Sequence, residues 1–292
     1  MNQKIASAIA LTLLTACSHV TGPLSSSQSQ RGFADVLREE QLRTVGIQPG
    51  TEKAHVATRI VVQEESDPDI QAMFVQMRAR KIDPQNPNVR KAVLAEGLLR
   101  LSASDRDVFI QRAAFMAENE VPPDCDGMDP TQSFPRHFSF AHATVELVRA
   151  SMDMEYRAMK AAATSTDNPV NVSPSQHSAA TAATGEQLIR DLNGDEAAQR
   201  KFAAFVVDPS HVSPTVKCFA AKASVAAISH LPQPLRDYAA IESLERLRLA
   251  NVAALLPLAR AQVNPALPVP SPSESSPSGG TIERRHAAAK QA

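Results

Sequence analysis

Aromatic residues and excess charge are both scarce in this chain. It has no Trp and two Tyr, and aromatic residues make up 4% of its 292 positions. Aromatic rings supply the stacking platforms for sugars and single-stranded bases, so both ligand classes are disfavoured. The 30 Lys and Arg residues are balanced by 31 Asp and Glu. Nucleic-acid binding needs a basic patch or stripe, so we expect no nucleic-acid partner.

Glycine and long apolar runs are also sparse. The chain has ten Gly residues among many Ala, a composition that favours helices over a turn-rich β architecture. No run after the first 17 residues approaches the ~18 apolar residues of a membrane span. We therefore predict an all-α fold, an irregular multi-helix domain of seven to nine helices.

The familiar catalytic and cofactor motifs are missing. The sequence contains no G-x-S-x-G, no Gly-rich phosphate loop, no C-x-x-C and no H-E-x-x-H. We therefore predict no cofactor and no metal, and we expect a non-catalytic protein more than an enzyme. The sequence does not exclude a hydrolase whose catalytic groups are brought together only by folding.

The first residues have the pattern of an export signal. Lys4 precedes an apolar run from residue 5 to residue 14, which covers about half of a ~30 Å hydrocarbon core at ~1.5 Å per residue. The run ends in Leu14-Thr15-Ala16-Cys17. This tetrad resembles the lipobox of bacterial lipoproteins. The alternative is an ordinary secretory signal with a Cys in this place by chance.

The lipoprotein resemblance implies a location and a membrane contact. It implies cleavage before Cys17, a thioether-linked diacylglycerol on its sulfur, and N-acylation, for example by palmitate, of the new terminus. Several acyl chains hold firmly where one binds only marginally. The residue after Cys17 is Ser18 and not Asp. By the same resemblance, the absence of Asp at this position implies sorting to the outer membrane, where the protein would face the periplasm. Without its signal the chain has 29 basic and 31 acidic side chains.

Composition divides the chain into four parts. Residues 1–16 are the expected signal peptide, and 17–31, rich in Ser and Gln, form the lipid anchor and a flexible tether. Residues 32–262 form the helical domain. Residues 263–292 form a Pro/Ser-rich tail that we expect to be disordered.

Apolar periodicity and capping residues predict the individual helices. The predicted ranges are 33–45, 69–81, 89–101, 104–119, 138–163, 178–192, 196–207, 213–230 and 235–256. Ser104 is the expected N-cap of the fourth helix, and Ser213-Pro214 is a cap followed by a first-turn proline. Residues 54–63 alternate weakly between apolar and polar, which indicates a possible strand.

Two clusters of polar residues are candidates for chemistry. His142 and Glu146, with His137 nearby, have the i,i+4 spacing by which a helix presents two ligands or an acid–base pair on one face. Arg149 and Asp153 continue that stripe, as on a solvated helix face with ion pairs. Asp124, Asp126 and Asp129 lie around Gly127. They are consistent with calcium binding, but the EF-hand order is not met and a turn is the simpler interpretation.

Cys125 and Cys218 are the two cysteines after the lipobox. An even pair in an exported protein indicates a disulfide. Cys218 shares a helical stripe with Ala221, Val225 and Ile228, so its side chain is expected in the core. Two unrelated buried thiols are the alternative.

Three functions remain open. The leading hypothesis is a lipid-anchored, non-catalytic interaction or assembly module of the cell envelope that binds an envelope protein, for example as an accessory of a secretion, conjugation or envelope machine. The second is an envelope hydrolase using His142 and Glu146. The third is a structural spacer.

Overall fold

The computed structural model describes residues 28–250, which form eleven α-helices, a short 3₁₀ turn η2 (Cys125–Gly127) and no strand. The helices are α1 (Gln28–Thr44), α2 (Glu52–Ser66), α3 (Pro68–Ala79), α4 (Pro87–Leu98), α5 (Ala103–Asn119), α6 (Pro130–Arg136), α7 (Val145–Thr164), α8 (Pro174–Asp191), α9 (Glu196–Val207), α10 (Pro214–Ser229) and α11 (Leu235–Ala250). The prediction of an all-α fold is confirmed for this part of the chain. The predicted number of helices was too low.

Many helices begin at a polar cap followed directly by proline. The cap side chain accepts a hydrogen bond from a free backbone N–H, and proline lacks the N–H that the first turn would leave unpaired. Five helices have this start: Asp67-Pro68, Asn86-Pro87, Asp129-Pro130, Ser173-Pro174 and Ser213-Pro214. Proline therefore delimits helices in this fold.

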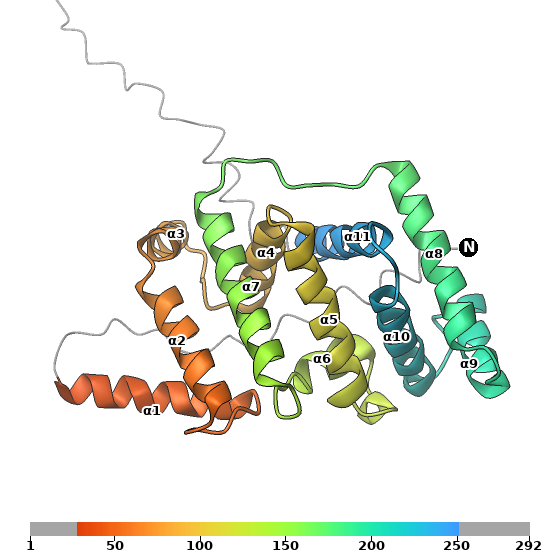
Figure 1. Ribbon diagram of the computed structural model, residues 1–292, viewed down its shortest axis with the longest axis horizontal. Helices are drawn as coiled ribbons and strands as arrows, with labels where there is room; N and C mark the ends of the chain where they lie inside the picture. Colours follow the sequence, from red (N-terminus) through yellow and green to blue (C-terminus); the bar gives the residue numbers. More distant parts are fainter. Residues whose placement is uncertain (1–27, 251–292) are drawn as a thin grey trace, which may run out of the picture.

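The helices form two layers (Figure 1). One layer is a row in which α2, α7, α5, α10 and α8 each pack against the next. The second layer lies across this row: α4 packs on α7, and α11 packs on α4, α5 and α8. Helix α9 lies at the edge of the molecule, against α10. The row therefore ends in a peripheral unit, α8 with α9.

Helices α4 and α7 cross at close range. At Gly97 of α4, a β-carbon would lie 1.9 Å from the carbonyl oxygen of Ala158. Only a residue without a side chain allows the two backbones to approach so closely. The crossing joins the main apolar core to a smaller cluster around Ile70, Phe74 and Met77 of α3. The N-terminal half of the domain is therefore tightly packed.

Two buried charge clamps tie these helices together. Asp67 accepts hydrogen bonds from Lys160 Nζ at 2.8 Å and Tyr156 Oη at 2.9 Å, which joins the start of α3 to α7. Arg106 of α5 binds both carboxylate oxygens of Asp237 in α11, at 2.7 and 3.0 Å. A bidentate pair of this kind fixes orientation as well as distance.

Two helices were not predicted from the sequence. Residues 54–63, predicted as a possible strand, lie within α2. Val56 and Ile60 share a buried helical face, whereas Val62 is 41% exposed, so the apparent alternation arose from a helix with a mixed outer face. The second is α6, which begins at the cap Asp129.

Some predicted boundaries also shift. The helix predicted from residue 138 begins at Val145, because Thr144 caps it and the preceding segment is held as a loop. Lys53 Nζ donates to the carbonyls of Phe140 and Ala141 at 3.1 and 2.9 Å, which fixes that loop. The cap of α5 is Ser102, not Ser104. Helix α1 begins at Gln28, inside the expected tether.

No helix among residues 28–250 is long and apolar enough to cross a membrane. The expected signal peptide, Cys17 and the tether up to residue 27 lie outside the described residues. The last part of the helix predicted at 235–256 and the Pro/Ser-rich tail lie outside them as well.

Candidate functional site

His142 and Glu146 do not share a helical face. His142 lies in the loop before the N-cap Thr144, with its side chain 70% exposed, and its Nδ1 is 3.2 Å from Glu120 Oε1. Glu146 lies in the exposed first turn of α7. Hydrogen bonds from its own backbone N–H and from Thr144 lower the pKa of Glu146. The spacing argument for an acid–base pair was therefore wrong, because it depended on a helix that starts three residues later than His142.

The remaining residues of the first cluster have other partners. His137 Nε2 lies 2.6 Å from Asp126 Oδ2, and Arg149 lies 3.9 Å from Glu52. Asp124 and Asp129 accept backbone N–H bonds from residues two positions later, as in Asx-turns. Within residues 28–250, no group of three or more His, Cys, Asp or Glu side chains is placed to hold a metal ion.

The two cysteines are joined. Cys125 in η2 and Cys218 in α10 form a disulfide with Cα atoms 5.7 Å apart, within the ~4.4–6.8 Å that such a bond requires. Both side chains are fully buried, and the helical stripe expected for Cys218 lies in the core. The bond ties the loop before α6 to the helix that supports the peripheral unit.

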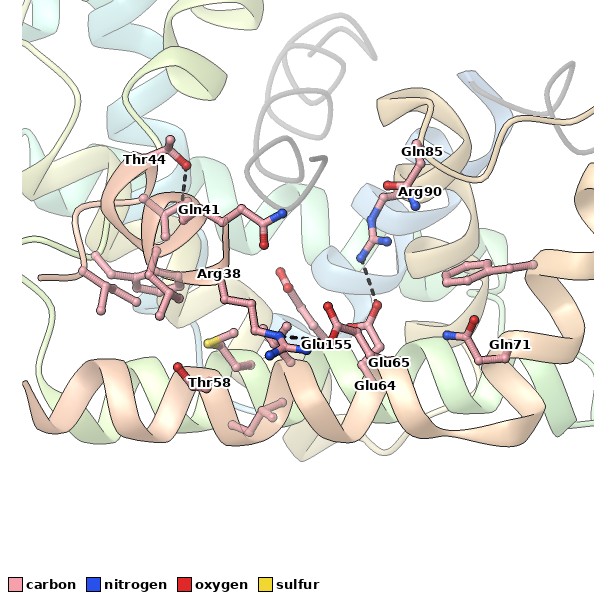
Figure 2. A pocket seen from close by; sticks show the side chains of 18 residues that line it. Arg38, Gln41, Thr44, Thr58, Glu64, Glu65, Gln71, Gln85, Arg90 and Glu155 are labelled. Atoms are coloured by element: carbon pink, nitrogen blue, oxygen red, sulfur yellow. Dashed lines mark hydrogen bonds and ion pairs between the residues drawn. The ribbon is translucent and has the colours of Figure 1, made fainter. Parts of the chain in front are cut away.

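A charged hollow of about 120 Å³ lies between α1, α2, α4 and α7. Figure 2 shows Arg38 and Arg90 reaching from α1 and α4 toward two neighbouring carboxylates of α2. Arg38 pairs with Glu65 at 2.7 Å, and Arg90 pairs with Glu64 at 3.1 Å. Both arginines are thus paired with acids of the same wall. We interpret these two ion pairs as structural contacts that hold α1 and α4 on α2.

The larger opening is an apolar groove of about 830 Å³ between α8, α9, α10 and α11, here named the α8–α11 groove. Its wall and rim are mainly aliphatic; the larger apolar side chains include Leu188, Ile189, Phe202, Val206, Val207 and Ile228. Two of them stand open to solvent, Ile189 at 71% and Val207 at 84% exposure. Ligand sites have this character: concave, mostly apolar and ~300–1,000 Å³ in volume.

The charged side chains among the described lining residues form one cluster. His177 Nδ1 in the first turn of α8 lies 2.8 Å from Glu242 Oε2 of α11. Arg246, one helical turn after Glu242, pairs with the other oxygen of the same carboxylate. Burial lowers the pKa of Arg246, yet a guanidinium stays charged at neutral pH. The groove therefore has one polar end and a long apolar remainder.

Three hydroxyl side chains of the groove wall, those of Ser178, Thr184 and Ser243, are not activated as nucleophiles. Such a nucleophile is hydrogen-bonded to its base. Instead, Ser178, Thr184 and Ser243 each donate to the carbonyl four residues earlier in their own helix, at 3.0, 2.8 and 2.8 Å. None of these three hydroxyls is therefore hydrogen-bonded to His177 or Glu242.

Sequence reasoning missed this groove. His177 and Glu242 are 65 positions apart, and neither lies in a motif. The available signal was the long helix α8 itself, whose many Ala, Ser and Thr residues provide little to bury.

Comparison with known proteins adds no relative: no family model, no curated protein and no solved structure matches the chain.

Proposed function

We propose that this protein is a lipid-anchored, non-catalytic binding module of the bacterial cell envelope, most simply at the outer membrane facing the periplasm, and that the α8–α11 groove is its binding surface. The observation that carries the proposal is the groove itself. Its apolar wall and its exposed rim residues Ile189 and Val207 remain uncovered by the rest of the described chain. Exposed apolar surface of this kind marks binding sites.

The hydrolase hypothesis loses its support in the same geometry. It depended on His142 and Glu146 facing one cleft, and His142 lies instead in an exposed loop beside Glu120. The disulfide agrees with an exported protein, because such bonds persist in oxidising compartments.

Anchoring is tested by labelling growing cells with a fatty-acid probe. The wild-type chain should take up the label, and Cys17→Ser should not. Equal labelling of both would overturn the lipid anchor and leave the groove to be judged separately.

The binding surface is tested in intact cells with a photo-crosslinking amino acid at Val207 on the groove rim. Val75 of α3, 61% exposed and outside the groove lining, is the matched control. We expect adducts, to protein or lipid, from position 207 and not from 75. The absence of adducts at 207, or equal adducts at both positions, contradicts the proposal.

A further inference from the structure

We infer that the α8–α11 groove binds an amphiphile with a single long acyl chain and an anionic head group, with the chain in the apolar trough and the head at His177 and Arg246. The inference rests on the proposed binding function and names its ligand class. It follows from the shape of the groove, the position of its charges and the lack of cover on its rim.

The dimensions suit one chain. Lining residues run along α8 from His177 to its C-cap Leu192, which is ~22 Å at ~1.5 Å per residue. One leaflet, half of a ~30 Å hydrocarbon core, is shorter than this trough, so an acyl chain and its head fit along it.

The charges favour an anion. The charged groups among the described lining residues are Arg246, His177 and Glu242. Glu242 is held between the two basic side chains and is 13% exposed, whereas His177 and Arg246 are 32% and 25% exposed. Arg246 has five N–H donors, more than its contact with Glu242 employs. A carboxylate or phosphate approaching this end therefore meets basic groups before the shielded acid.

The rest of the trough suits an aliphatic chain. Leu188, Val206 and Ile228 line it with few aromatic rings, and three of the wall hydroxyls donate to carbonyls of their own helices. Polar groups gathered at one end of an otherwise apolar site fix the orientation of a ligand. Here they orient it head-first toward the start of α8.

Palmitate is the probe, and calorimetry measures its binding to the full chain with Cys17→Ser, so that no acyl group of its own competes. Monopalmitin tests a neutral head, hexadecyltrimethylammonium a cationic head, and laurate a shorter chain. We expect palmitate to bind at one site, with the cationic analogue at least tenfold weaker. Laurate should also be weaker, because each buried methylene adds to affinity.

Two matched pairs of variants locate the site. Ala203→Trp fills the groove from α9 and should abolish binding, whereas Ala204→Trp, exposed on the same helix and outside the lining, should leave it unchanged. Arg246→Gln should weaken palmitate about tenfold and monopalmitin less than twofold. Arg248→Gln, which removes a group outside the lining, should affect neither.

Several outcomes overturn the inference. These are no saturable binding of palmitate, equal binding of the anionic and cationic analogues, or binding that survives Ala203→Trp. If palmitate fails while Val207 crosslinks to a protein in cells, the proposed binding function stands and the ligand class is wrong. If neither experiment gives a signal, both fail.

Discussion

Helices α4 and α8 occupy opposite kinds of environment in the same domain. Of the twelve residues of α4, eight are buried, whereas α8 buries two of eighteen. Helix α4 crosses α7 at Gly97, so closely that a methyl group has no room, and α8 leaves a groove of about 830 Å³ beside it. Close packing and open apolar surface are thus separated in space: the region around α4 is packed tightly, and the region around α8 leaves apolar surface exposed, where we propose that a ligand binds.

The largest expected effect comes from removing the disulfide that joins η2 to α10, one of the helices that line the groove. Replacing both Cys125 and Cys218 by Ala should lower the free energy of unfolding by ~2–5 kcal/mol, because the bond closes a loop of 93 residues. Urea unfolding measures the change. Reductant should destabilise the wild type and leave the double variant unaffected. A loss below ~1 kcal/mol would show that packing alone holds η2 against α10.

Replacing a glycine by alanine should change the stability of the protein in opposite directions in the two regions. Gly97→Ala should destabilise by ~1–3 kcal/mol or more, because the new methyl meets the Ala158 carbonyl. Gly185→Ala, in α8 where the residue lines the groove, should stabilise by up to ~1 kcal/mol through helix propensity. Thermal unfolding of both variants tests the contrast. Equal effects would mean that the two regions are packed alike.

Asp67 gives the tight region a pH dependence. Burial alone raises the pKa of Asp67, but hydrogen bonds from Lys160, Tyr156 and the amides of Ile70 and Asp69 lower it to about 2, from 3.8. A carboxylate with a depressed folded pKa stabilises fully above pH 3.8, and this stabilisation is lost as the pH falls through about 2.

The size of this effect is ~1–2 kcal/mol, after allowance for solvent screening at the partly exposed Lys160. Asp67→Asn should therefore be less stable than the wild type at pH 7. The gap should narrow as the pH falls from 4 toward 2, measured by urea titration at each pH. If the stability difference between the wild type and Asp67→Asn stays constant with pH, Asp67 does not contribute to the acid sensitivity of the protein.

The smallest effect is expected at the groove rim. Ile189→Ser should change stability by no more than ~0.5 kcal/mol, because this side chain is 71% exposed. The control is Ile70→Val in the tight region, which removes a single methyl group from a fully buried side chain and should cost ~0.5–1.5 kcal/mol. If Ile189→Ser is the more destabilising of the two, the rim is part of the core.

The sequence predicted the parts of this fold that depend on local chemistry. Ser213-Pro214 marked the start of α10, and the range 196–207 matched α9. The disulfide was predictable because the sequence has one pair of cysteines after Cys17, the expected lipid-bearing residue. Asp129-Pro130 is the same kind of start signal as Ser213-Pro214, and α6 could have been predicted from it.

What escaped prediction depends on contacts between distant segments. Phe138 and Phe140 have helical spacing to the residues of α7, yet they belong to a loop held by Lys53 from α2. The candidate site has the same origin. His177 meets Glu242 only because α8 packs on α11. The groove is a space that the side chains of several helices leave unfilled, and the periodicity of a single helix does not predict such a space.

The disulfide also changes what a protease can do to this protein. The connection between α7 and α8 is an extended segment with exposed residues such as Thr166 and Asn168, and segments of this kind are preferred cleavage sites. A single cut there falls between Cys125 and Cys218, so the two fragments stay covalently joined until the bond is reduced. Nicked molecules should migrate as one chain on a non-reducing gel and as two after reduction.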